Sequence, residues 1–175
     1  MQAAVTEEDR ILVGQLLGRE PRGLVDIPVR DKLGEPVVIQ VDAMVANKPF
    51  PTLFWLVDKR LNFAIDQLEA GGLIAQLQTQ VDESPELQAQ LSADHLAYIE
   101  LRQALMPTAT ARALQDKGFG DVLASRGIGG IANFQRIRCL HTYYGAHLVV
   151  PNAIGNLVDE YWAAKGQVFD HLSRS

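Results

Sequence analysis

The stretch LVDIPVRDKLGEPVVIQV, residues 24–41, contains two runs that are rich in β-branched residues. Between them, residues 31–35 (DKLGE) have the length and the glycine of a hairpin loop. Pro28 and Pro36 cannot donate a hydrogen bond to a neighbouring strand, so they predict an edge strand or a late strand start. This stretch therefore predicts an antiparallel β-hairpin.

A third apolar run, TLFWLV at residues 52–57, follows Pro49 and Pro51. It extends the hairpin into a small, mostly antiparallel sheet of three strands. Helical patterns fill most of the remaining chain. We therefore expect an α+β fold in which this sheet packs against a majority of α-helices. A single domain over residues 1–175 is expected, because this length suits one hydrophobic core.

Capping residues and prolines mark where the helices begin and end. TEED at residues 6–9 resembles a capping box, and Ser84 followed by Pro85 is a strong helix start. Residues 107–130 are expected to hold only short helical pieces. The longer helices are expected from residue 6 to Gly18, from Asp58 to about Val81 with a break at Gly71 and Gly72, from Ser84 to about Met106, over residues 133–150 and over residues 155–172.

Composition excludes several classes of function. The 16 basic and 21 acidic side chains give a net charge of −5, which argues against a nucleic-acid partner. A single cysteine excludes an internal disulfide. The sequence has neither a signal-peptide pattern at its start nor an apolar run of the roughly 18 residues that a membrane helix needs. We expect a soluble protein of the reducing cytoplasm.

The only cysteine lies in the segment RIRCLHTYYGAH, residues 136–147, with two of the four histidines. On a straight helix, Cys139 and His141 would point in nearly opposite directions, and Cys139 and His147 would lie about 12 Å apart along the axis. Neither pair could then chelate one ion. If residues 136–141 were extended, Cys139 and His141 would share a face. The backbone therefore decides between a site and a hydrogen-bonded histidine beside a core cysteine.

A second candidate site lies on the helix that Ser84 opens. His95, Tyr98 and Arg102 are spaced by three and four residues, so they project from one side of that helix and could hold an anion. The alternative is a solvated face or one that hydrogen-bonds to another helix. Further candidates for anion binding are the arginines near the cysteine and around Pro21, namely Arg138, Arg19 and Arg22.

Six segments of the chain carry a family resemblance. They are LGREPRG (17–23), the RD..GEPVV pattern (30–38), FPTLFWL (50–56), the HxxYxxxR pattern of His95, Tyr98 and Arg102, RIRCLH (136–141) and the pair Asp159-Glu160. In this order they resemble the bacterial domain of unknown function 501 family, over about residues 12–163. The family has no established activity, so the resemblance implies no reaction.

The resemblance does imply a set of metal ligands. Many relatives carry a cysteine where Asp31 stands and a cysteine or histidine where Asp58 stands, beside residues that match Cys139 and His141. Four such residues resemble a zinc site. Aspartates are harder ligands that weaken the preference for a thiolate-loving metal, so the site has either changed its metal or been lost. Asp58 also fits the N-cap of the helix that follows it.

Two functions of different classes fit these residues. The first is a small-ligand or metal-binding domain, in which Asp31, Asp58, Cys139 and His141 hold a divalent metal such as zinc beside an anionic ligand. Neither a catalytic residue nor a reaction is assigned by the sequence.

The second function is a non-catalytic interaction module that binds a protein partner or forms a homodimer. Its support is the apolar segment at residues 50–55 and the amphipathic tail with Tyr161, Trp162 and Phe169. The alternative for these aromatic residues is a place in the hydrophobic core.

Overall fold

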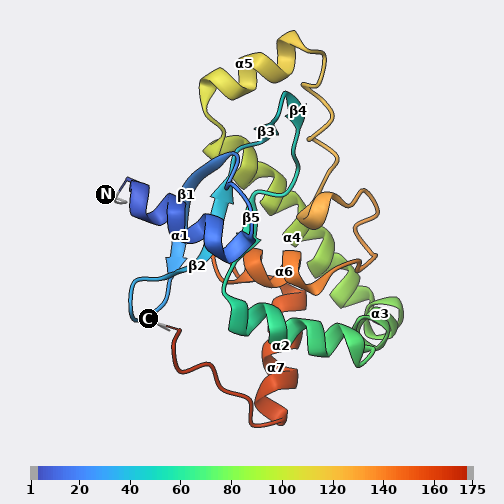
Figure 1. The fold of residues 1–175 in the computed structure, drawn as a ribbon. Helices are drawn as coiled ribbons and strands as arrows, with labels where there is room; N and C mark the ends of the chain where they lie inside the picture. The colour runs from blue at the N-terminus through green and yellow to red at the C-terminus, as the bar shows by residue number, and fades with distance from the viewer. Residues whose placement is uncertain (1–3, 173–175) are drawn as a thin grey trace.

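The computed structural model describes residues 4–172. Figure 1 shows a small sheet with helix α1 (Glu7–Leu17) lying across one face and the other helices grouped beyond it. Thr6 caps α1, and its hydroxyl and the Asp9 carboxylate bind each other's backbone N–H groups. The expected α+β fold with a majority of helices is confirmed.

The main sheet consists of strands β1 (Leu24–Arg30), β2 (Pro36–Val41) and β5 (Phe54–Leu56), which are antiparallel in the order β1-β2-β5. The predicted sheet of three strands is therefore confirmed. Pro28 lies in an edge strand, and Pro36 is the first residue of β2, so neither removes a hydrogen bond from the middle of the sheet. A second, smaller hairpin pairs β3 (Met44–Val45) with β4 (Lys48–Pro49).

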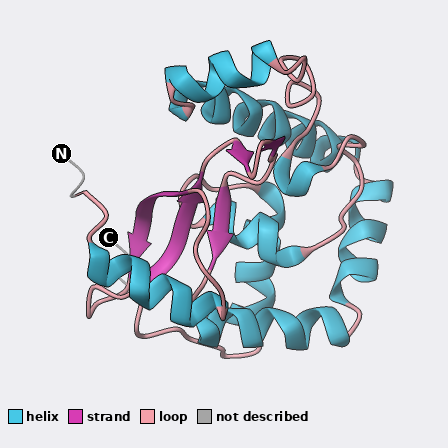
Figure 2. Cartoon of the chain, turned by 45° about the horizontal axis from the view of Figure 1, so that its top comes forward, coloured by secondary structure: helices cyan, strands magenta, loops and turns pink. Residues whose placement is uncertain are grey.

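Helices form most of the rest of the described chain (Figure 2). The break at Gly71 and Gly72 separates α2 (Lys59–Ala70) from α3 (Leu73–Glu83), and Ser84 caps α4 (Pro85–Leu105) as expected. The remaining helical elements are α5 (Thr108–Asp116), the 3-10 turn η1 (Ile128–Gly130), α6 (Leu140–His147) and α7 (Ala153–Ala164).

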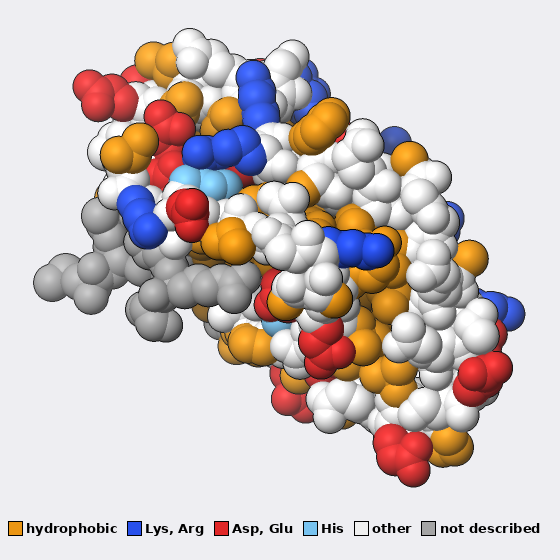
Figure 3. All heavy atoms as spheres, turned by 90° about the horizontal axis from the view of Figure 1, so that it is seen from below, with side chains coloured by type: hydrophobic (Ala, Val, Ile, Leu, Met, Phe, Trp, Pro, Cys, Tyr) orange, Lys and Arg blue, Asp and Glu red, His pale blue; other side chains and the backbone are white. Residues whose placement is uncertain are grey.

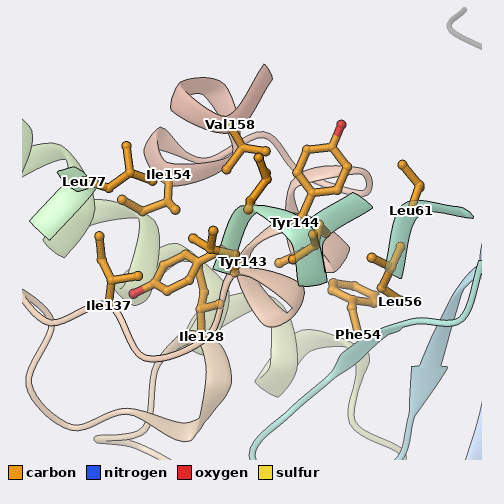
Figure 4. Close-up of a cluster of buried hydrophobic side chains, with 14 of the residues drawn as sticks. Phe54, Leu56, Leu61, Leu77, Ile128, Ile137, Tyr143, Tyr144, Ile154 and Val158 are labelled. Atoms are coloured by element: carbon orange, nitrogen blue, oxygen red, sulfur yellow. The ribbon is translucent and has the colours of Figure 1, made fainter. Parts of the chain in front are cut away.

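The two faces of the sheet pack against different layers. Val13 of α1 joins Ile39 of β2 in one apolar cluster. On the opposite face, Phe54 and Leu56 join a larger cluster that includes side chains of α6. Figure 4 shows that neighbouring tyrosines of α6 point in opposite directions, Tyr143 toward Ile128 and Ile137 and Tyr144 toward the side of Val158 and Leu61. Helix α6 is therefore buried on several sides.

Helix α6 also covers the outer edge of β5. A methyl group at Gly145 would stand 3.2 Å from the backbone nitrogen of Leu56 and 3.7 Å from the carbonyl oxygen of Phe54. A side chain here would push the helix and the strand apart by a few tenths of an ångström, so glycine suits this close approach. The outer edge of the sheet is thus protected from pairing with another chain.

The helix expected over residues 133–150 is wrong in its first part, because α6 begins at Leu140. Cys139 has an extended backbone, with φ −153° and ψ 121°. The Gln78 side chain accepts from the N–H of Ile137 and donates to the carbonyl of Gln135, at 2.9 and 2.8 Å. A side chain of α3 thus satisfies backbone groups that a continuous helix would have paired internally.

The helix expected over residues 155–172 is also wrong in its extent, because α7 ends at Ala164. The N–H of Gln167 binds the carbonyl of Trp162, which turns the chain out of the helix. The chain then returns to the first hairpin, where the N–H of Lys32 donates to the carbonyl of His171 at 2.9 Å. Within residues 4–172, no helix is both long enough and apolar enough to cross a membrane.

Gly155 of α7 lies against the ring of His147, so a substitution at this position measures how tightly the helices are packed. A methyl group at Gly155 would overlap the ring of His147, which cannot retreat because Asn152 and Asp159 hold both of its nitrogens. We expect Gly155→Ala to lower the free energy of unfolding by about 1–3 kcal/mol, although alanine favours helices. Urea unfolding measures this change. Gly120→Ala is the control, since its nearest neighbour would lie 4.0 Å away, and an equal loss in both variants would contradict the packing argument.

Candidate functional site

Cys139 and His141 lie side by side at the start of α6. Because residue 139 is extended, its Sγ atom lies 3.6 Å from Nδ1 of His141. The hydroxyl of Thr142 donates to the carbonyl of Cys139 at 3.0 Å, which helps to fix this turn. An extended backbone was the condition under which we expected Cys139 and His141 to share a face, and the two side chains do lie together. The thiol is half-buried, and the imidazole retains an exposed fraction of 25%.

Two carboxylates of α2 face this histidine. An Oε1 atom of Glu69 lies 3.4 Å from Nδ1 of His141 and accepts the backbone N–H of Leu140 at 2.7 Å. On the other side of the ring, Oδ1 of Asp66 lies 3.1 Å from Nε2 of His141. Sequence reasoning missed both acids. Their spacing of three places them on one side of a helix, which was the available signal, but nothing in the sequence connects that face with Cys139.

Among the described residues, Glu69, Cys139 and His141 form the one group whose ligand-type atoms all lie within 4.8 Å of one another. The hydrogen bond to Cys139, with the two nearby carboxylates, raises the pKa of His141 to about 9, although burial opposes this. Burial alone would raise the pKa of the Cys139 thiol, but hydrogen bonds from His141 and the backbone N–H of Thr142 lower it overall. Each group thus favours the charged form of the other, with the pKa of the imidazole raised and the pKa of the thiol lowered.

His141 also lines a pocket of about 310 Å³. The pocket lies between β5, α2 and the first turn of α6, and aromatic and aliphatic side chains alternate with polar ones on its walls. Its lining residues are Thr52, Phe54, Trp55, Leu56, Asn62, His141 and Thr142. A small molecule in this pocket would contact the imidazole of the cluster.

The two predicted aspartate ligands lie elsewhere. Asp58 caps α2 through the N–H of Leu61 at 2.8 Å, which confirms its role as an N-cap. Asp31 closes the hairpin loop, where its Oδ1 accepts two backbone N–H groups at 2.8 and 2.9 Å. Glu69 follows Asp58 by eleven residues on the same helix, which corresponds to about 16 Å along the axis. Asp31 and Asp58 therefore form a cluster separate from Cys139 and His141.

Asp31 and Asp58 share a cation of the protein itself, the side chain of Arg60. The Arg60 guanidinium lies 3.2 Å from Asp31 and 3.5 Å from Asp58. Nε2 of His171 lies 3.2 Å from Oδ2 of Asp58 without forming a hydrogen bond. Both carboxylates are thus engaged without a metal ion.

The predicted anion-binding face of α4 points into the protein. His95, Tyr98 and Arg102 share one side of the helix as expected, and all three are buried. The Tyr98 hydroxyl accepts the N–H of Leu53 at 2.6 Å. The Arg102 guanidinium donates to the carbonyls of Pro51, Leu123 and Arg126. Tyr98 and Arg102 therefore hold loops in place, instead of facing solvent or hydrogen-bonding to another helix as the alternative supposed.

His95 has the same structural character. Its Nδ1 atom accepts the N–H of Ile128 at 3.0 Å, and its Nε2 atom lies 3.1 Å from the hydroxyl of Tyr143. The ring stacks on Phe134 at a centroid distance of 4.7 Å. Burial lowers the pKa of His95 to about 4, so the ring is neutral near pH 7.

The three remaining arginine candidates are exposed. Arg138 precedes the cysteine, whereas Arg19 and Arg22 lie in the turn after α1. The guanidinium of Arg19 stands 5.2 Å from the centre of the Trp55 ring. Arg22 and Glu20 form a weak, exposed pair at 3.7 Å.

The aromatic residues of the interaction hypothesis are mostly in or against the core. Trp162 is buried, and Tyr161 and Phe169 pack against the same cluster. A groove lies between α2 and the segment after α7, where Phe63 and Val168 keep exposed fractions of 65% and 69%. Hydrophobic side chains also gather on the face seen from below in Figure 3. Nothing in the structure indicates what partner would cover them.

These features define an α+β protein with a cysteine, histidine and glutamate cluster beside a pocket. The model of the family described as Protein of unknown function (DUF501) matches residues 27–160. The match covers most of the 175 residues, so the chain belongs to this family, as its motifs indicated. No curated protein and no solved structure matches the chain.

Buried His95 predicts a loss of stability in acid. Its pKa is about 4 in the folded protein against an ordinary value of 6.5, so the unfolded chain binds more protons between these values. The free energy of unfolding should fall by up to about 3 kcal/mol as the pH drops through this window. Urea unfolding at pH 7 and pH 4.5 measures the fall. His95→Gln should flatten it, and an unchanged slope in this variant would refute the assignment.

Proposed function

We propose that Cys139, His141 and Glu69 bind a zinc ion, with a free coordination position that is accessible to a small ligand. The distances between the ligand atoms carry this proposal. Tetrahedral zinc with ordinary bond lengths places a sulfur and a nitrogen ligand roughly 3.6 Å apart, and a nitrogen and an oxygen ligand roughly 3.4 Å apart. The corresponding distances in the protein are 3.6 and 3.4 Å.

The surroundings of His141 support the same proposal. Histidines that bind a metal through one ring nitrogen usually donate the other N–H to a carboxylate, which fixes the ring and strengthens the ligand. Asp66 stands in this position, 3.1 Å from Nε2, while Nδ1 faces Cys139 and Glu69. The N–H of Leu140 donates to Oε1 of Glu69, the oxygen that faces His141, and so helps to hold this carboxylate in place.

Three protein ligands and a free position are typical of catalytic rather than structural zinc sites. Zinc held in this way polarises a bound oxygen atom or acidifies a bound water molecule. The adjacent pocket offers apolar walls and the polar groups of Asn62 and Thr142 to such a ligand. A metal-dependent small-ligand site is therefore the function that we infer, and a reducing compartment such as the cytoplasm would keep the thiol available.

This proposal changes the set of ligands that the family resemblance implied. Glu69 takes the place of Asp31 and Asp58, whose carboxylates lie at the other end of α2 with Arg60. A set of one sulfur, one nitrogen and one oxygen ligand still suits zinc.

Variants distinguish the two ligand sets. The protein, purified without a tag and dialysed against zinc, should retain about one ion per chain, because three ligand atoms converge. Cys139→Ser and Glu69→Gln should lose most of this ion, and Asp66→Asn should weaken binding by about 10–100-fold. Asp31→Asn is the matched control and should bind normally. Metal analysis and competition with a chelating dye are the measurements.

Two results would contradict the zinc site. One is wild-type protein that retains no zinc under these conditions, with circular dichroism showing that it is folded. The other is loss of zinc in Asp31→Asn but not in Cys139→Ser, which would restore the aspartate set.

The raised pKa of His141 predicts how zinc binding depends on pH. With a pKa of about 9, the imidazole carries a proton that zinc must displace at neutral pH. The association constant should therefore rise at least about tenfold per pH unit between pH 6 and pH 8. Dye competition at three pH values measures this slope. Binding that is independent of pH over this range would show that zinc is not held by this imidazole.

A further inference from the structure

A second pocket, of about 160 Å³, lies on the side of the sheet that faces α1. A cavity of ~150 Å³ in another protein accommodates a benzene molecule, so this pocket has the size of an aromatic ring. Its walls are largely aliphatic and aromatic and come from α1, β2, β5 and the turn between β3 and β4. They include Leu17, Ile39, Val41, Val45, Phe50 and Trp55.

The mouth of this pocket carries positive charge. Arg19 and Arg22 both line it, together with Glu20. Arg22 and Glu20 are 3.7 Å apart with side chains that are 71% and 79% exposed, and such pairs are weak. Arg19 has no ion-pair partner among residues 4–172, and its guanidinium stands over the Trp55 ring. The arginine is thus placed against the aromatic wall while its donors remain available to a ligand.

The geometry points to a site for a small aromatic carboxylate, with its ring in the apolar pocket and its carboxylate on Arg19. The planar guanidinium fork matches a carboxylate through two parallel hydrogen bonds. The pocket has room for one ring and little more, which favours a benzoate-sized molecule.

This site does not depend on the proposed zinc site. Trp55 lines both pockets, but the charged partner of the ligand is Arg19 here and the cysteine cluster there. A result that disproves the zinc site would therefore leave the carboxylate site standing, and the reverse is also true.

Calorimetric titration with benzoate tests the inference on the whole chain. We expect a dissociation constant of roughly 1 mM or below for the wild type. Arg19→Gln should weaken binding by about tenfold or more, because it removes a charged hydrogen-bonding partner. Arg10→Gln makes the same charge change at an exposed position of α1 and should leave binding unchanged. Val45→Phe should abolish binding by filling the pocket.

Control ligands, the wild type itself and a variant at the zinc site can each overturn the inference. Acetate and phosphate carry the charge without the ring, and benzyl alcohol carries the ring without the charge, so equal binding of any of them would refute the assignment. No measurable benzoate binding by the folded wild type would do the same. Cys139→Ser should bind benzoate normally, and a loss in this variant would place the ligand at the zinc site instead.

Discussion

The close packing of α6 against β5 is the constraint on which the arrangement of the candidate site depends. Gly145 lets the helix lie directly on the outer strand. At the start of the helix, His141 and Thr142 line one pocket with residues of the same strand. The tyrosines that follow each other in α6 then enter the core on opposite sides (Figure 4). Both tyrosine side chains are buried, so α6 is held from two sides, and Cys139 and His141 stand at its start.

Helix α2 organises the polar groups around this anchored helix. Its first turn is capped by Asp58, which shares Arg60 with Asp31 of the hairpin loop. Near its other end, Glu69 accepts the first N–H of α6 and approaches His141. A carboxylate at this place also complements the positive end of the α6 dipole. One helix thus joins the sheet to the cysteine cluster while keeping the two groups of acids apart.

Buried polar side chains of α4 have a structural role, because they bind backbone groups that no regular secondary structure pairs. Residues 117–139 contain few regular elements, and their buried backbone groups still need partners. Arg102 binds carbonyls at Leu123 and Arg126, and His95 binds the N–H of Ile128. A pattern of histidine, tyrosine and arginine on one helix face therefore serves loop packing in this protein, although its spacing equally suits an anion site.

The sequence by itself determined the elements whose signals are local. The hairpin at residues 24–41, the caps at Thr6, Asp58 and Ser84, and the family membership all follow from neighbouring residues or ordered motifs. Only the tertiary structure decided where α6 begins, because Gln78 and Glu69 bind its leading backbone groups from distant helices. Long-range packing also brings Glu69 and Asp66 to His141, whereas Asp31 stays in its hairpin loop with Arg60. Local spacing fixes which residues share a face, whereas the packing of distant segments decides what that face meets.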